Sequence, residues 1–529
     1  MRNSHDIVAR FRAAAREDAH RAAINFAGRT CSYDRLDRCS DELALRICER
    51  GIQYPGNIAV IDCERSPALV LAMLACLKAR MAFFVIGENQ PEAYVGRVLA
   101  DLKEVFWLGA AGHSDPDKAR RIAGDRLGAC CIFDGDELER STDPSQTERM
   151  RGLAECAGQR EARGMYLVAT SGTTGRAKLV FTGMEPVVNF IDWYRRTFAL
   201  CAMDKFSMLS GLGYDPLIRD VFTPLCTGAC ISIPAKEALG SRRGLRDWIN
   251  ETQVSVIHAT PQIADVIFHW DDGGAFESVR LVTLGGAPLT QRLAARIKSR
   301  LTRGCVVNVY GTSETPQVMA YHVVDEITEE SGTGVVPIGK GIDGVTLQVL
   351  DEEGAPKQEC EVGEIHVLTP HLSLGYYEAP ELTASKFGFS EQDRCRFYRT
   401  GDLGFIDERG NLHFVGRKDR QVKHRGYRMR LEEIEQAMLS LDEVLAAAVV
   451  LDGSAGPDKL VCYLQYKDGL QPKLADIKQR ISTLLPTYML PDHYVALERM
   501  PLGGGNKIDY AALAKAAVAA KAGSSVTVL

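Results

Sequence analysis

Apolar runs of strand length alternate with helix-like stretches along this 529-residue chain as far as Tyr310. Between the runs, apolar residues recur at helical spacing, and this alternation is typical of a parallel sheet covered by helices. The expected strands occupy residues 57–62, 81–86, 105–108, 165–168, 205–209, 229–233, 254–259, 279–284 and 306–310. We therefore expect two successive α/β units, the first ending near residue 160.

The pattern changes after Val335. Short alternating strands at 345–350, 364–368 and 411–415 are separated by glycine turns, which predicts a small antiparallel barrel or distorted sheet. A polar, glycine-led segment at 416–420 follows and is typical of a hinge, and a compact α+β stretch lies beyond it. The predicted fold class is α/β: a large N-terminal domain (1–417) of two α/β subdomains plus the small barrel, followed by a small mobile α+β domain (418–529).

Composition excludes several classes of partner. The formal net charge is −6, so the chain lacks the basic excess of a nucleic-acid or membrane binder. No apolar run approaches the ~20 residues of a membrane span. The 15 cysteines have no zinc-ligand spacing, and without a signal peptide they favour a reducing cytoplasm. Residues 7–22 form an amphipathic, Arg-rich helix, which we expect to dock on the fold rather than to act as a transit peptide.

The strand-like run 165–168 leads into a loop of small, mostly hydroxylated residues. Small residues let backbone N–H groups approach a polyanion, hydroxyl groups add donors, and a following lysine adds charge, so the loop has the chemistry of a phosphate site. A Gly/Thr-rich surface turn is the alternative. The Walker P-loop spacing and its Gly-Lys-Ser/Thr ending are absent. The residues concerned are Thr170, Ser171, Gly172, Thr173, Thr174, Gly175 and Lys178.

Further motifs follow this loop in a fixed order, and together they carry a resemblance. They are Tyr310-Gly-Thr-Ser-Glu314, Tyr398-Arg-Thr-Gly-Asp402, Gly416-Arg-Lys-Asp-Arg-Gln-Val-Lys-His-Arg-Gly426, and a terminal Lys507 framed by Pro501-Leu502 and Ile508-Asp509. With these motifs the chain resembles the adenylate-forming superfamily, and within it the amino-acid adenylation domains of nonribosomal peptide synthetases. The resemblance runs from Cys31 to Lys507.

The resemblance implies an ATP site with Mg²⁺. The loop at 170–175 would cradle the β- and γ-phosphates, Glu314 would bind Mg²⁺, and Tyr310 would stack on adenine. Asp402 would accept the ribose hydroxyls, and Arg417 would contact ribose and phosphate. The implied ATP-binding residues are the loop residues named above with Lys178, Tyr310, Gly311, Thr312, Asp402 and Arg417.

Each residue type, taken alone, also has a structural interpretation. Glu314 is suited to a helix N-terminus and Tyr310 to a core position at a strand end. Asp402 after a Thr-Gly turn is commonly an Asx turn, and Arg417 is commonly a solvated surface residue.

The family implies two catalytic lysines and a hinge. Lys507 would bridge the substrate carboxylate and the phosphate during adenylation. Lys423 would serve the second, thiol-transfer step after the C-terminal domain rotates about Asp419. The run Gly503-Gly-Gly-Asn506 departs from the family pattern while the position of Lys507 is kept.

Asp215 marks the expected substrate pocket, because amino-acid adenylation domains keep an aspartate there for the substrate ammonium. Its alternative is a helix N-cap before Pro216. Arg219 needs a carboxylate partner if it is buried, and we expect the neighbouring Asp220 to supply it, with a substrate acid as the alternative. The expected lining residues are Asp215, Pro216, Arg219, His258, Val282, Leu284, Gly286, Val309, Gln317 and Val318.

The leading hypothesis is an enzyme that adenylates an amino acid and loads it onto the phosphopantetheine of a separate carrier protein, because no Leu-Gly-Gly-x-Ser carrier motif follows Lys507. We expect peptide or hybrid natural-product biosynthesis in the cytoplasm, without nucleic acid or membrane. An acyl- or aryl-CoA ligase is one alternative. A catalytically weak binding or scaffold homologue, motivated by the altered loops near Arg176 and Gly503, is another.

Overall fold

The computed structural model describes residues 6–51, 58–88, 90–139, 164–170, 177–269, 274–324, 334–418, 420–453, 458–467, 472–501, 508–510 and 512–514. Its contacts divide the chain into two compact units. The first comprises Met1–Glu88, Ala100–Ala169 and Leu179–Lys418, and the second comprises Asn89–Leu99, Thr170–Lys178 and Asp419–Leu529. The expected domain boundary between 417 and 418 stays a prediction.

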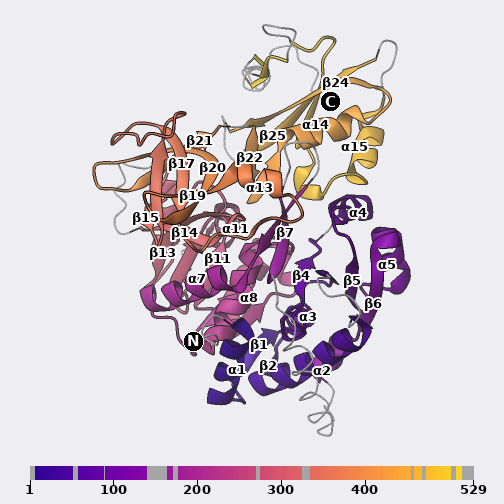
Figure 1. Ribbon diagram of the computed structural model, residues 1–529, viewed down its shortest axis with the longest axis vertical. Helices are drawn as coiled ribbons and strands as arrows, with labels where there is room; N and C mark the ends of the chain where they lie inside the picture. Colours follow the sequence, from indigo (N-terminus) through magenta and orange to yellow (C-terminus); the bar gives the residue numbers. More distant parts are fainter. Residues whose placement is uncertain are drawn as a thin grey trace. The chain divides into compact units, whose positions relative to one another are not determined.

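A seven-stranded sheet forms one layer of the first unit (Figure 1). Its order is β18 (Gly375–Tyr376), β8 (Lys178–Thr182), β7 (Tyr166–Thr170), β4 (Ala82–Val85), β3 (Ile58–Asp62), β5 (Val105–Ala110), β6 (Leu127–Phe133). The pairs from β7 to β6 are parallel, and β18 is antiparallel to β8. Every residue of β3, β4 and β5 is buried, as expected for parallel strands covered on both faces.

A nine-stranded sheet carries most of the candidate site. Its order is β15 (Lys340–Gly341), β14 (Thr315–Val323), β13 (Cys305–Thr312), β12 (Leu281–Leu284), β11 (Val256–Ala259), β9 (Lys205–Ser207), β10 (Cys230–Ile233), β1 (Ala22–Phe26), β2 (Arg29–Ser32). The strands from β13 to β1 are parallel, whereas β14, β15 and β2 are antiparallel additions at the ends. The expected second α/β unit is therefore present.

Helices of the first unit connect these strands. They are α1 (Ile7–Glu17), α2 (Tyr33–Gly51), α3 (Pro67–Lys78), α5 (Pro116–Ala123), α7 (Met184–Thr197), α8 (Pro216–Thr227), α9 (Lys236–Leu239), α10 (Arg242–Thr252), α11 (Pro261–Phe268), α12 (Gln291–Ser299) and α13 (Pro380–Lys386). Proline at the first helical position starts α3, α8 and α11, where its missing N–H costs nothing. Helix α3 is buried along almost its whole length, as its apolar run predicts.

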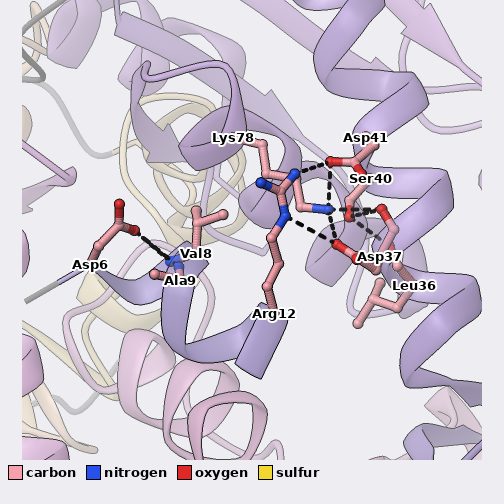
Figure 2. A network of polar contacts seen from close by, with 9 residues as sticks. All are labelled: Asp6, Val8, Ala9, Arg12, Leu36, Asp37, Ser40, Asp41 and Lys78. Atoms are coloured by element: carbon pink, nitrogen blue, oxygen red, sulfur yellow. Dashed lines mark hydrogen bonds and ion pairs between the residues drawn. The ribbon is translucent and has the colours of Figure 1, made fainter. Parts of the chain in front are cut away.

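The N-terminal helix docks on the fold, as its amphipathic pattern predicts. Its apolar side is buried at Phe11, and its polar side joins an ion network with α2 and α3. Figure 2 shows the ends of Arg12 and Lys78 directed at Asp37 and Asp41. The Lys78 side chain is 2 % exposed and its Nζ lies 2.8 Å from Asp41, so two carboxylates compensate one buried ammonium.

An antiparallel sheet follows, as expected for the region after Val335. Its strands are β16 (Thr346–Leu350), β17 (Gly363–Leu368), β20 (Cys395–Ile406) and β19 (Phe387–Ser390), with β21 (Leu412–Arg417) paired to β20. The register of β20 shifts between Leu403 and Gly404. A bulge of this kind bends a strand, which accounts for the distortion that the sequence pattern predicts.

The second unit has its own small core. A sheet of β24 (Val444–Asp452), β25 (Lys459–Tyr466) and β26 (His493–Ala496) packs with α14 (Leu431–Leu439) and α15 (Leu474–Ser482). A hairpin of β22 (Gln421–His424) and β23 (Tyr427–Arg430) precedes them, and α4 (Glu92–Leu99) belongs to the same unit. Arg97 of α4 donates to the Leu484 carbonyl oxygen at 2.6 Å.

Candidate active site

Three residues expected to bind the nucleoside meet at one point in the first unit. The Tyr310 hydroxyl at the end of β13 donates to Asp402 Oδ2 at 2.6 Å, and Arg417 of β21 forms an ion pair with Oδ1. Asp402 is fully buried, and the Arg417 side chain is 7 % exposed. Arg417 is therefore not a solvated surface residue, and Asp402 holds two side chains from separate strands.

A glycine makes the turn that carries Asp402 possible. Gly401 adopts a φ of +72°, and a Cβ there would lie 3.1 Å from Arg417 Nη2. The Thr400 hydroxyl accepts from the Asp402 backbone N–H at 2.9 Å. This local bond belongs to a Thr-based turn, so the Asp402 carboxylate remains available for Tyr310 and Arg417 rather than closing an Asx turn.

Glu314 lies in the turn between β13 and β14 and is 1 % exposed. The Tyr376 hydroxyl donates to its Oε1 at 2.8 Å. Among the described residues, no group of three or more His, Cys, Asp or Glu side chains lies together as a metal cage. A lone carboxylate fits Mg²⁺, which commonly takes one or two carboxylates and completes its shell with phosphate oxygens and water.

Asp215 precedes α8, but it does not cap that helix. Its backbone is helical (φ −51°, ψ −42°) and its side chain makes no capping bond, which rejects the N-cap interpretation. Three hydrogen bonds reach the carboxylate instead. Tyr166 Oη–H and Gln317 Nε2 donate to Oδ1, the latter at 3.1 Å, and the Gln317 backbone N–H donates to Oδ2 at 3.1 Å.

The backbone of β14 is shaped to reach Asp215. Gln317 has a φ of +69°, an uncommon conformation for a residue with a side chain. A Cβ at Gly311 would lie 3.0 Å from the Gln317 carbonyl oxygen, so a side chain there would force the two strands slightly apart. Backbone strain of this kind is typical of functional sites.

The electrostatics around Asp215 are unusual for a carboxylate. It is 7 % exposed, and burial raises its pKa to about 6, against the hydrogen bonds from Tyr166 and Gln317 that lower it. It forms no ion pair with the residues that the structure describes. Gln317 Oε1 beside it is buried and has no hydrogen-bond donor among those residues. The group therefore offers acceptor oxygens that make no ion pair with a described residue, although the positive charge of Arg219 also lowers the pKa of Asp215.

His258 and Asp220 form a separate buried chain. His258 Nδ1 lies 2.9 Å from Asp220 Oδ1, and Nε2 lies 3.1 Å from the Tyr194 hydroxyl, which contacts Thr283 Oγ1 at 2.6 Å. Burial lowers the pKa of His258. Both ring nitrogens are used by protein partners, so hydrogen bonds within the protein hold His258, and its expected place in the pocket lining stays a prediction.

The expected pairing of Arg219 with Asp220 is wrong. Asp220 Oδ1 is bound by His258, and Oδ2 accepts from the backbone N–H groups of Leu209 and Ser210 at 3.1 and 2.9 Å. Arg219 is 5 % exposed and forms no ion pair or hydrogen bond with any residue that the structure describes. Adjacent helical residues point in different directions, which explains why the nearest acid in sequence is not its partner.

Two of the expected lining residues belong to β12. Val282 and Leu284 of β12 belong to the apolar core that also contains Trp248 and Ile297. Thr283 between them contacts Tyr194 on the opposite face, because successive strand residues alternate. Thr283 is therefore the residue of β12 on the His258 side, and the lining role expected of Val282 and Leu284 stays a prediction.

The remaining lining positions lie at the ends of the same elements. Pro216 is the first residue of α8, and Gly286 follows β12 with a φ of +83°. Val309 and Val318 lie in the larger apolar core. Thr312, expected at the nucleotide, bonds through its backbone N–H to Thr315 Oγ1 at 2.9 Å and closes the turn at Glu314.

The phosphate loop and the catalytic lysines are described only in part. Thr170 and Lys178 flank the loop, and Thr170 Oγ1–H donates to the Lys178 carbonyl oxygen at 3.4 Å. Lys423 lies on β22 opposite Arg428 of β23. Ser171, Gly172, Thr173, Thr174, Gly175, Asp419 and Lys507 lie outside the described residues.

Comparison with known proteins identifies the family. The AMP-binding enzyme family model matches residues 11–377. The chain belongs to the AMP-binding enzyme family. It is an adenylate-forming ligase, a class of enzyme that uses ATP. In the part of the chain that the structure describes, no helix combines the length and apolarity needed to span a bilayer.

Two curated relatives and one solved structure illustrate the similarity. Zwittermicin A synthase ZmaJ of Bacillus cereus is 29% identical over 93% of this chain and 91% of its own length. Tyrocidine synthase 3 of Brevibacillus parabrevis is 28% identical over 96% of this chain, which spans only 8% of that protein. Holo-PA1221, a nonribosomal peptide synthetase protein containing adenylation and PCP domains, superposes with a TM-score of 0.79 at 25% identity, covering 96% of this chain and 84% of that one.

Proposed function

We propose that this AMP-binding enzyme activates an α-amino acid. The α-carboxylate would attack the α-phosphorus of ATP, forming an aminoacyl-adenylate and releasing pyrophosphate. The observation that carries the proposal is Asp215, a buried carboxylate without an ion pair among the described residues. A substrate ammonium supplies the missing charge and brings three donors, which Asp215 and the vacant acceptor Gln317 Oε1 would receive.

The nucleotide half of the proposal rests on the Tyr310–Asp402–Arg417 group. These side chains are pre-positioned by one another, which lowers the cost of ordering them around a nucleoside. Mg²⁺ at Glu314 would supply charge neutralisation for the phosphates when bound. Lys507 is proposed to approach the substrate carboxylate, and the loop at 170–175 with Lys178 to bind the phosphates.

The second step proposed is transfer of the aminoacyl group to the phosphopantetheine thiol of a separate carrier protein, with release of AMP. PA1221, a solved structure similar to this chain, contains adenylation and PCP domains in one protein, which supports a carrier domain as the acceptor; that the carrier is a separate chain is part of the proposal. Lys423 is proposed for this step. It lies on a tight hairpin whose turn residues, Arg425 and Gly426, both have positive φ. We place this reaction in cytoplasmic peptide or hybrid natural-product synthesis.

Amino-acid-dependent exchange of labelled pyrophosphate into ATP tests the first step. A panel of amino acids should contain at least one that drives exchange, and Lys507→Ala should abolish most of that exchange while leaving ATP binding largely intact. Lys236→Ala, at an exposed lysine of α9, is the matched control and should behave as wild type. Exchange driven only by fatty or aromatic acids, and indifferent to Asp215→Ala, would instead establish an acyl- or aryl-CoA ligase.

The hinge is tested with Asp419→Pro, which fixes φ at one residue and should block domain rotation. We expect pyrophosphate exchange to be retained and thioester formation on a carrier protein to stop. Exchange in the same preparation is the internal control for folding. Equal loss of both activities would contradict the hinge assignment.

A further inference from the structure

Helix α8 carries a row of polar residues through apolar surroundings. Asp215, Arg219 and Thr223 follow one another at intervals of four residues, so they share one side of the helix. Between these positions lie the buried apolar residues Leu217, Val221 and Phe222, and one further buried acid, Asp220, whose carboxylate is bound by His258. Asp215 is the proposed ammonium site, and Arg219 lies one helical turn further along.

Arg219 is a buried guanidinium that pairs with none of the residues described in the structure. It is 5 % exposed, its Nε has no hydrogen-bond acceptor, and no carboxylate among the described residues pairs with it. Transfer of an unpaired charge out of water is costly, and native proteins normally pair a buried arginine with an acid. The adjacent Asp220 is already committed to His258 and two backbone amides.

Arg219 lies beside the proposed ammonium site. It is one helical turn from Asp215 on the same side of α8, and its positive charge lowers the pKa of that carboxyl group. Thr223 Oγ1, one turn beyond it on the same side of α8, is also buried and without a hydrogen-bond partner among the described residues. An anion bound here would accept from the guanidinium and from this hydroxyl.

We propose that the amino acid activated by this enzyme carries an acidic side chain, whose carboxylate binds Arg219 while its ammonium binds Asp215. This inference rests on the proposed function. In such a complex, each buried charge of the α8 row, that of Asp215 and that of Arg219, is paired with an opposite charge of the substrate. A neutral side chain would leave the guanidinium uncompensated, and a basic one would add like charge beside it.

The spacing of the two sites favours a short dicarboxylic amino acid. Residues four apart on a helix have Cβ atoms about 5–6 Å from each other. Aspartate, glutamate and the homologue one methylene longer are therefore the candidates. Their order of preference is left to the assay, since Arg219 has a long, adjustable side chain.

Pyrophosphate exchange with matched substrates tests the inference. Aspartate and glutamate are compared with asparagine and glutamine, which have nearly the same shape without the charge. We expect the wild-type enzyme to favour one acid over its amide by at least about 100-fold in kcat/KM, since a site built around a buried charge discriminates strongly. Arg219→Met should reduce that ratio to near one, mainly through KM for the acid, with KM for ATP unchanged.

Arg10→Met is the matched control, because Arg10 pairs with Asp192 on both guanidinium nitrogens outside the α8 row. It should leave the acid-to-amide ratio unchanged. A preference for a neutral amino acid, or a ratio that survives Arg219→Met, overturns the inference and leaves amino-acid activation intact. If Arg219→Met does not fold, the wild-type ratio of kcat/KM for the acid to that for its amide is used alone. A ratio below about tenfold overturns the inference. Absence of exchange with every amino acid rejects the proposed function itself.

Discussion

Acid should lower kcat/KM for the amino acid through one carboxyl group, that of Asp215. Its pKa of about 6 stands well above the ordinary 3.8, because burial penalises the charged form. Only the ionised form attracts an ammonium. About nine-tenths of the free enzyme has this form at pH 7 and about one-tenth at pH 5, so kcat/KM for the amino acid should fall about tenfold between them.

The pH profiles of kcat/KM and of kcat report the pKa of Asp215 in the free enzyme and in the substrate complex, respectively. The substrate ammonium stabilises the ionised carboxylate, so the pKa of Asp215 in the complex lies below its value in the free enzyme. The acid limb of kcat should therefore appear at lower pH than that of kcat/KM. If Asp215 had an ordinary pKa, kcat/KM for the amino acid would not fall at pH 5.

Asp215→Asn provides the decisive comparison. Breaking a buried ion pair by removing one partner costs about 3 kcal/mol or more, which corresponds to at least about 150-fold in kcat/KM. The variant's profile should be flat between pH 5 and 7 at that lower level. The kcat/KM for ATP at saturating amino acid, measured in the same buffers, corrects for titration of ATP itself. A wild-type acid limb near pH 4, or a limb near pH 6 that persists in Asp215→Asn, would refute the role of Asp215.

Three further outcomes are expected. Tyr310→Phe leaves Asp402 Oδ2 without its described donor and should lower the free energy of urea unfolding by about 1–3 kcal/mol and raise KM for ATP. Gly401→Ala forces a side chain into a φ of +72° and toward Arg417, so the unfolding free energy should fall by about 1–3 kcal/mol, again with weaker ATP binding. His258 has a lowered pKa, so its stabilising contribution is complete above pH 6.5 and is lost as pH falls through its folded value; His258→Gln should lack that part of the acid destabilisation in unfolding titrations.

The fold class could be predicted because its signals are local. Apolar runs of four to six residues, bounded by glycine and polar residues, predict strands such as β3 and β12 whatever their neighbours are. The short alternating strands after Val335 likewise form an antiparallel sheet. The pattern does not reveal which strands pair, since β1 lies beside β10, about two hundred residues later in the chain.

The side-chain contacts of the site were harder to predict for physical reasons. All four residues of β12 are buried, because helices cover both faces, so the sequence has no polar alternation to show that Thr283 faces Tyr194. The sequence does not reveal that Asp220 bonds to His258, because the bond joins residues far apart in the chain. The error at Arg219 was avoidable, since neighbours at i and i+1 on a helix do not face each other.

The charged residues at the start of α8 have two different roles: one bonds within the protein, and two are proposed to bind the substrate. A rotation of about 100° separates Arg219 from Asp220 on the helix, so the two cannot serve the same side. Asp220 turns to the sheet, where His258 and two backbone N–H groups take three of the about four acceptor positions that a carboxylate offers. Asp215 and Arg219 lie on another side of the helix, and neither forms an ion pair with a described residue, although the charge of Arg219 lowers the pKa of Asp215. Because burial makes each of these charges costly alone, a zwitterion with one further acidic group is the simplest ligand that compensates both and still has an α-carboxylate free to react.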